Sequence, residues 1–158
     1  MSGFDEMLNN AIEKGRQQGK KTSQAAADQK MTQEDIKRLH SKYRLHLSDV
    51  IEKHMEPLPN HFPGFQFETV YGERGWGAAC HRDDVGRGRR GFYSRLELTV
   101  RPLGEFEVLD ISVRGTVRNK EVLQRSFFQE LDKVDLDRFE ETIQNWILSY
   151  AEQFSAAS

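Results

Sequence analysis

One cysteine, four prolines and no long apolar run characterise this chain of 158 residues. The single cysteine, Cys80, excludes an internal disulfide framework and any zinc or iron–sulfur site built from several thiolates. Trp146-Ile147-Leu148 is typical of the length of the apolar runs, whereas about 18 apolar residues are needed to span a bilayer. Asp5 and Glu6 stand where a secretory signal peptide needs basic and then apolar residues. We therefore expect a soluble, cytoplasmic protein with no membrane segment.

A strong charge of either sign is also missing. The formal net charge is −2, too small to indicate a polyanionic partner for the whole chain. Hydrophobic residues make up 37% of the chain, below the ~45–50% of an average soluble domain, so part of the chain is expected to lie outside a packed core. The length suits one domain, since compact domains commonly have about 100–150 residues.

Residues 1–31 differ in composition from the rest of the chain. Their apolar residues have the spacing of an amphipathic helix of about three turns: Phe4, Met7, Leu8, Ala11 and Ile12. The segment from Gly15 to Gln24 is rich in Gly, Gln, Lys and Ser, which is typical of a flexible linker. We expect residues 1–31 to form a flexible N-terminal arm with a short amphipathic helix, and residues 32–158 to form a single α+β domain.

Two long helices are predicted, one at each end of this domain. The first begins at Thr32, whose hydroxyl can cap the first turn, and ends before Pro57. Its apolar residues recur in steps of three to five: Ile36, Leu39, Tyr43, Leu47, Val50 and Met55. The second helix follows Asp135, with an apolar stripe of Leu136, Phe139, Ile143, Ile147, Tyr150 and Phe154.

Between the two helices the period of the apolar residues changes to two, which predicts strands. We expect strands over residues 65–71, 76–80, 92–100, 109–118 and 121–128. The connections are short, so the strands form hairpins in an antiparallel sheet. The predicted fold class is α+β: an antiparallel four- or five-stranded meander sheet flanked by a long N-terminal and a long C-terminal helix.

The hydrophobic pattern also predicts how the strands pair. A two-residue loop at Leu103-Gly104 would set Leu98 beside Leu109 and Leu96 beside Ile111, matching apolar with apolar. A further turn is expected at Asn119-Lys120. The alternate positions of these strands are polar, which predicts a second sheet face that meets water or a polar partner.

A loop rich in glycine and arginine is predicted over residues 82–91. Its segment Gly86 to Gly91 matches G-x-G-x-x-G, but a strand follows it where a dinucleotide site needs a helix. Arginines beside the ring of Tyr93 can bind single-stranded nucleic acid through phosphates and bases. The sequence pI near 6.2 and the acids Asp83 and Asp84 favour the alternative, a charged and solvated hairpin loop. The candidate binding residues on this reading are Arg74, Arg82, Arg87, Arg89, Arg90, Tyr93, Arg95, Arg101 and Arg114.

One cluster has residue types that resemble a catalytic site: Glu73, Cys80, His81 and Asp83. Cys80 and His81 are neighbours on a predicted strand and point to opposite faces, so they do not act on one another. Glu73, His81 and Asp83 remain acid–base candidates, beside a pocket near residues 73–84 between the sheet and a helix. The other histidines lack metal-ligand spacing, and we predict no metal or cofactor.

Three functions follow from these patterns. The leading hypothesis is a non-enzymatic module, an adaptor or chaperone-like protein that binds another polypeptide, with homodimerisation through an uncovered sheet face or edge also expected. A stripe of Phe4, Leu8 and Ile12 would dock in the partner's groove. One alternative is a small enzyme or anionic-ligand-binding protein with a pocket near residues 73–84. The other alternative is a single-stranded nucleic-acid-binding protein that uses the loop 82–91.

Overall fold

The computed structural model of the protein describes residues 2–29, 32–84 and 91–157. The chain divides into two compact units, Met1–Ile36 and Lys37–Ser158. This division falls five residues after the boundary that composition predicts between residues 31 and 32. Each unit is described by itself below.

The first unit is dominated by one helix, α1 (Ser2–Gln29), of 28 residues. The sequence predicts a helix of only about three turns here, followed by a linker over residues 15–24. That prediction is wrong in length, because the helix continues through both Gly15 and Gly19. A glycine in a helix interior costs about 1 kcal/mol relative to alanine, which the Gln, Lys and Ala residues that follow can offset by their good helix propensity.

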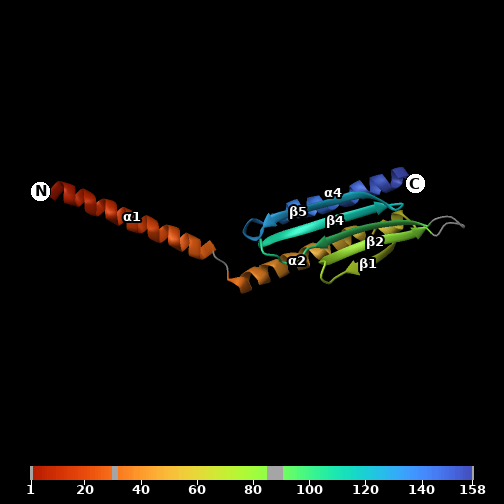
Figure 1. The fold of residues 1–158 in the computed structure, drawn as a ribbon, viewed down its shortest axis with the longest axis horizontal. Helices are drawn as coiled ribbons and strands as arrows, with labels where there is room; N and C mark the ends of the chain where they lie inside the picture. The colour runs from red at the N-terminus through yellow and green to blue at the C-terminus, as the bar shows by residue number, and fades with distance from the viewer. Residues whose placement is uncertain (1, 30–31, 85–90, 158) are drawn as a thin grey trace. The chain divides into compact units, whose positions relative to one another are not determined.

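The second unit contains a five-stranded antiparallel sheet, which confirms the predicted α+β class. The strands lie side by side in chain order, as a meander: β1 (Gln66–Val70), β2 (Trp76–Asp84), β3 (Phe92–Val100), β4 (Val108–Val117) and β5 (Lys120–Glu130). Short helices precede and follow this sheet, α3 (Leu58–His61) and the single turn η1 (Leu131–Lys133). The colours of Figure 1 follow this order across the sheet.

Two long helices pack on one face of the sheet, α2 (Gln33–Met55) and α4 (Leu136–Ala157). Their ends are as the sequence predicts. The backbone N–H of Asp35 donates to Oγ1 of Thr32 at 3.1 Å, which caps α2. The backbone N–H of Arg138 donates to Oδ1 of Asp135 at 3.4 Å, at the start of α4.

The core of the domain lies between this helix layer and the sheet. β3 contributes Leu96, Leu98 and Val100, all almost fully buried. The helices contribute Leu47 and Ile51 from α2, together with the stripe Phe139, Ile143, Ile147, Tyr150 and Phe154 from α4. These are mostly the positions that the three-and-four spacing and the period of two predict.

The predicted hairpin register between β3 and β4 is wrong by four residues. The structure pairs Leu98 with Val113 and Val100 with Ile111. An even shift keeps every side chain on its own face, so the hydrophobic pattern matches equally well in both registers. A wider loop closes the hairpin, with Glu107 at a φ of 52° and its N–H directed at the carbonyl of Gly104 at 3.5 Å.

Other boundaries also differ from the prediction. The turn after β4 is formed by Arg118 and Asn119, at φ values of 48° and 70°, one residue earlier than predicted. Two consecutive positive φ values are the signature of the tight turn whose twist suits a hairpin. The predicted loop 82–91 begins too early, because β2 extends through Asp84. Residues 85–90 lie outside the described part of the chain.

Candidate functional site

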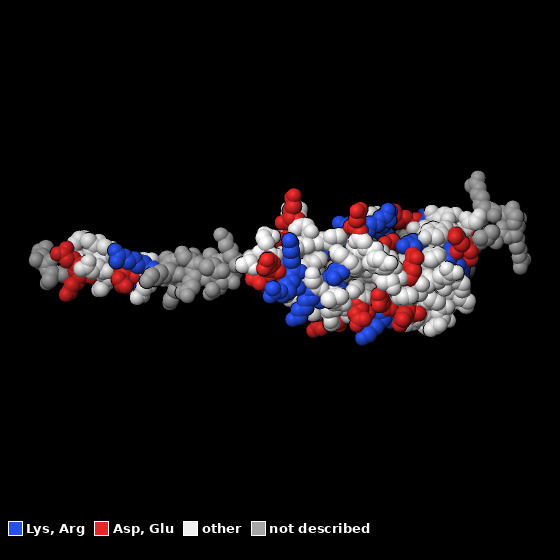
Figure 2. Space-filling model, turned by 90° about the horizontal axis from the view of Figure 1, so that it is seen from below, with Lys and Arg blue, Asp and Glu red and all other residues white. Residues whose placement is uncertain are grey.

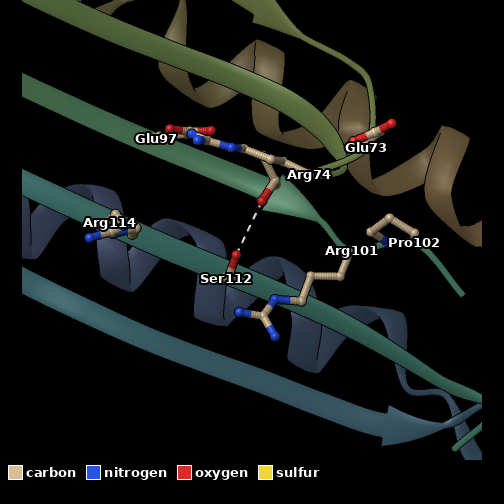
Figure 3. Close-up of a pocket in the computed structure, with 8 residues that line it drawn as sticks. Glu73, Arg74, Glu97, Arg101, Pro102, Ser112 and Arg114 are labelled. Carbon is tan, nitrogen blue, oxygen red and sulfur yellow. Dashed lines mark hydrogen bonds between the residues drawn. The ribbon is translucent and has the colours of Figure 1, made fainter. Parts of the chain in front are cut away.

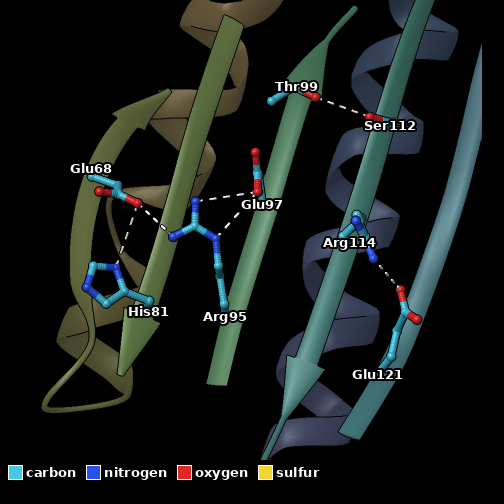
Figure 4. A network of polar contacts seen from close by, with 8 residues as sticks. All are labelled: Glu68, His81, Arg95, Glu97, Thr99, Ser112, Arg114 and Glu121. Carbon is cyan, nitrogen blue, oxygen red and sulfur yellow. Dashed lines mark hydrogen bonds and ion pairs between the residues drawn. The ribbon is translucent and has the colours of Figure 1, made fainter. Parts of the chain in front are cut away.

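The face of the sheet away from α2 and α4 is polar. The residues of β3 and β4 on this face are cross-strand partners: Arg95 with Thr116, Glu97 with Arg114, and Thr99 with Ser112. In Figures 3 and 4 both long helices lie behind the strands, on the opposite side from these groups. We call this surface the open face. It is the polar face that the alternation of residues predicts.

Arg95 is at the centre of a tight ion cluster on the β1–β3 part of the open face (Figure 4). Its Nη1 donates to Oε1 of Glu68 at 2.7 Å, and its Nε and Nη2 are 3.4 Å from Oε2 of Glu97. Partial burial works against the charged guanidinium, but the hydrogen bond to Glu68 and the charge of Glu97 hold the pKa of Arg95 above its ordinary value. Arg95 is therefore a structural cation, with its donors committed to Glu68 of β1 and Glu97 of β3.

A hollow of about 480 Å³ lies beside this cluster on the open face. It is lined by the turn before β2, by β3 and the residues that follow it, and by β4: Glu73, Arg74, Glu97, Thr99, Arg101, Pro102, Ser112 and Arg114. Figure 3 shows the side chain of Arg74 reaching along the sheet toward Glu97, while Arg101 extends from the opposite side. The hollow is of the size that small-molecule sites have, about 300–1,000 Å³.

The floor of the hollow is a pair of hydroxyl groups. Thr99 Oγ1 and Ser112 Oγ lie 3.1 Å apart and share one hydrogen bond. Thr99 is only 5% exposed, and its partner is half-buried. One hydroxyl donates to the other, so the second retains a hydrogen that it can donate to a bound group.

The three guanidinium groups of the hollow are held loosely. Arg114 Nη2 is 3.5 Å from Oε1 of Glu121, and Arg101 Nη1 is 3.8 Å from Oδ2 of Asp110. Their side chains are 67% and 56% exposed. Arg74 is exposed and has no ion pair within 4 Å among the described residues. Burial raises the pKa of Asp110, and the charge of Arg101 only partly opposes this effect.

Arg82, predicted as a binding residue, is packed instead as part of the structure. Its guanidinium lies 4.9 Å from the ring centroid of Phe154 and 5.5 Å from that of Phe65. It also donates to the carbonyl of Pro63 at 3.2 Å and to Oδ2 of Asp84 at 2.9 Å. These contacts hold its guanidinium against the domain, which does not favour a role in binding, and the prediction that Arg82 binds a ligand stays a prediction.

Three of the other predicted nucleic-acid residues, Arg74, Arg101 and Arg114, line the hollow, whereas Tyr93 is not among its lining residues. Arg87, Arg89 and Arg90 lie outside the described residues. Tyr93 is half-buried, with its ring centroid 6.5 Å from that of His81 on the neighbouring strand. Acidic and basic side chains are interspersed over the domain surface seen in Figure 2, with no field of one sign across it. This face of the domain therefore shows no continuous basic stripe of the kind typical of nucleic-acid-binding proteins.

The structure does not bring the acid–base candidates Glu73, His81 and Asp83 together. No hydrogen bond or ion pair joins any two of them in the described chain. Glu73 lies in the turn before β2, whereas His81 is five residues into that strand, about 17 Å further along. His81 Nδ1 lies 3.9 Å from Oε1 of Glu68, beyond hydrogen-bond distance.

Cys80 is on the face opposite to His81, as the sequence predicts. It is fully buried, and its Sγ lies 3.6 Å from the backbone carbonyl of Met55. Burial raises the pKa of the thiol to about 11, against a small opposing contribution from Arg95. A buried, protonated thiol is a core group, not a nucleophile.

The hollow was only partly predictable from the sequence. Arg74, Arg101 and Arg114 are among the predicted binding residues, and Glu73 is among the acid–base candidates. Its floor and one wall, Thr99, Ser112 and Glu97, were predicted only as polar residues of the open face. The predicted pocket between the sheet and a helix is not the hollow described here, which lies on the opposite side of the sheet.

No group of three His, Cys, Asp or Glu side chains in the described chain is placed to share a metal ion. Among the helices that the structure describes, none combines the length and apolarity needed to cross a membrane. Comparisons of the chain with protein-family models, curated proteins and solved structures found no match.

Proposed function

We propose that this protein is a polypeptide-binding module, an adaptor or chaperone-like protein that docks α1 into an apolar groove of a partner protein. The observation that carries the proposal is the apolar stripe of α1. Its large side chains are 45–69% exposed: Phe4, Met7, Leu8 and Ile12. The cytoplasmic location expected from the sequence belongs to the same proposal.

The stripe needs a partner for a physical reason. α1 belongs to the compact unit Met1–Ile36. The described residues of this unit form α1 and the first turn of α2, and none of them is in a strand. Most helices in proteins are stabilised by packing of an apolar face, and burial of each large apolar side chain contributes about 1.5–3 kcal/mol. Docking of Phe4, Leu8 and Ile12 would supply that burial.

The spacing of the stripe indicates the form of the partner. Residues four apart lie on one face of a helix, so Phe4, Leu8 and Ile12 form a row about 12 Å long. Such rows insert into grooves between helices of a partner. Asp5 is exposed beside this row, which favours a groove with a basic group at its rim.

The test replaces the stripe in the full chain. The variant Phe4→Ser/Leu8→Ser/Ile12→Ser removes the apolar row, and the matched control Glu6→Ser/Asn10→Ser/Glu13→Ser changes the opposite side of the same turns. Cross-linking in cells of the source organism with mass spectrometry identifies the partner, and titration of the purified partner measures affinity. The stripe variant is expected to weaken binding at least about a hundredfold, since three buried anchors are lost, and the control to weaken it less than about threefold.

Two other results would oppose the proposal. If α1 packs on its own domain, hydrogen exchange of residues 4–12 will be slow in the isolated monomer, and the stripe variant will lower the melting temperature of the domain. If the stripe binds a second copy, the wild-type chain will be a dimer by light scattering and the stripe variant a monomer. The second result replaces the adaptor with a homodimer, the other association that the sequence suggests.

A further inference from the structure

We propose that the hollow on the open face binds a compact oxyanion with two negative charges, such as a dicarboxylate or a phosphate group of metabolite size. The inference rests on the domain Lys37–Ser158 alone and is independent of α1. Arg101 and Arg114 would hold the anion, Arg74 would close over it, and a hydroxyl of the Thr99–Ser112 pair would donate to it.

The chemistry of the lining fits an oxygen-rich ligand. A guanidinium presents two parallel N–H groups that match the spacing of the oxygens in a carboxylate or phosphate. Arg114 comes from β4, Arg101 follows β3, and Arg74 comes from the turn before β2, so the three arginines line the hollow from three parts of the chain (Figure 3). The hydroxyl pair supplies a neutral donor between them.

The arginines of the hollow are free to bind in a way that Arg95 is not. Arg95 is 27% exposed and has a contact of 2.7 Å to Glu68. Arg101 and Arg114 have single contacts of 3.8 and 3.5 Å, and each is more than half exposed. Exposed ion pairs of this kind contribute little to stability. A ligand that replaces Asp110 or Glu121 as the partner of an arginine therefore costs the fold little stability.

The same surface argues against a longer polyanion. The hollow is bordered by the carboxylates of Glu97 and Glu73, and the strands beside it carry Asp110 and Glu121. A strand of nucleic acid would place successive phosphates over these groups, whereas a compact anion contacts only the guanidinium and hydroxyl groups. Glu97 is already paired with Arg95, so its charge is partly compensated from outside the hollow.

Arginine side-chain NMR of the full chain tests this site directly. We would titrate ¹⁵N-labelled protein at low ionic strength with succinate, with inorganic phosphate and with neutral succinamide. Succinate or phosphate is expected to shift the Nε–H signals of Arg74, Arg101 and Arg114 saturably, and succinamide to shift none of them. The tighter of the two anions identifies whether the ligand is a carboxylate or a phosphate.

Variants separate this site from general anion attraction. Arg101→Gln/Arg114→Gln is expected to weaken binding by about tenfold or more, because charge-assisted hydrogen bonds are among the stronger ones. Ser112→Ala is expected to weaken it by about threefold or more, through loss of a neutral donor. Arg125→Gln is the matched control: Arg125 is exposed and pairs with buried Val113, on the helix-covered side of the sheet, and its loss should leave binding unchanged.

Three results would overturn the proposal. Shifts that do not saturate, or that spread equally to Arg118 and Arg125, would show only general attraction. Equal binding by the double variant and the wild-type chain would remove Arg101 and Arg114 from the site. Tighter binding of a single-stranded oligonucleotide through the same three arginines, with a steep salt dependence, would replace the compact ligand with nucleic acid.

Discussion

The two faces of the sheet are made by the same strands, yet they are stabilised in different ways. On β3, Leu96, Leu98 and Val100 point to the helices and are almost fully buried. The residues between them, Arg95, Glu97 and Thr99, point to the open face. Arg95 and Thr99 pair with polar groups of neighbouring strands, and Glu97 pairs with Arg95 on β3 itself. The covered face depends on the exclusion of water and on close packing, whereas the open face depends on ion pairs that water weakens.

The open face is itself divided. Around Arg95, a short contact and partial burial fix the donors between β1 and β3. Around the hollow, Arg101 and Arg114 keep long, exposed pairs. Surfaces that bind ligands need donors not fully committed within the protein, which is why the proposal places the ligand in the second region and not beside Arg95.

The largest expected effect on the free energy of unfolding comes from a comparison of two adjacent residues of β3, Leu98 and Glu97. Leu98→Ala removes a side chain that is 1% exposed and leaves a cavity, so we expect a loss of about 2–5 kcal/mol in the free energy of unfolding. Glu97→Gln keeps the shape of the side chain on the open face and leaves Arg95 paired with Glu68. We expect that variant to lose about 1 kcal/mol or less. Urea denaturation at pH 7 measures both.

The comparison would fail if the two variants were equally unstable. That result would mean that the ion pairs of the open face contribute as much as the core beneath it. A shared decrease in the slope of the denaturation curve would instead indicate a change in the unfolded state, and the midpoints would then not measure the two faces.

The sequence predicts the covered face well, because its signal is repeated. The period of two in β3 and β4 and the three-and-four spacing in α4 each assign many residues to one face. One residue that departs from the pattern therefore does not change the predicted face. The start of α2 was also predictable, since Thr32 has the side chain that caps a helix. The strand order was predictable because the connections are short. Strands that follow one another in the chain then lie next to each other in the sheet.

Register and the hollow depend on signals that the sequence does not repeat. The β3–β4 register is ambiguous by four residues because Leu98 meets an apolar residue in both alignments. The loop that decides it contains Glu107 in a left-handed conformation, which composition does not indicate. The hollow needs the turn at Glu73 and Arg74 and residues of β4 to lie on the two sides of β3, an arrangement that follows only from the register.

A second prediction uses two glycines to probe close packing on the covered face. A Cβ at Gly115 would lie 2.8 Å from Cδ2 of Tyr150 and 3.2 Å from Cβ of Leu123. The Tyr150 ring cannot retreat freely, because its hydroxyl donates to the carbonyl of Thr116 at 2.7 Å. We expect Gly115→Ala to lower the free energy of unfolding by about 1–2 kcal/mol. The cost of overpacking exceeds the stabilisation that alanine gives by restricting the unfolded chain.

Gly104→Ala is the control for that variant. Nothing lies within 4 Å of a Cβ at Gly104, and its φ is not in the left-handed region. We expect its melting temperature to stay the same or to rise slightly, because alanine restricts the unfolded chain. Equal losses from both substitutions would show that the backbone, and not the contact with α4, limits Gly115.

The smallest expected effect concerns a buried histidine of the helix layer that covers the sheet. His40 lies on α2, is 4% exposed and has no partner for its Nε2. Burial lowers its pKa; a hydrogen bond with the backbone of Arg101 opposes this, and the charge of Arg44 adds to it. The ring is therefore neutral in the folded protein at pH values where the unfolded chain begins to bind a proton.

The sign of the pH effect follows from that difference. As the pH falls below the ordinary histidine value of 6.5, the unfolded state takes up a proton that folded His40 resists, so the free energy of unfolding falls until the folded ring is protonated. One such group changes stability by at most about 1.4 kcal/mol per pH unit. In urea denaturation at pH 7 and pH 5, His40→Leu should lose less stability on acidification than the wild-type chain. An identical loss in the two proteins would remove His40 as the source of the acid sensitivity.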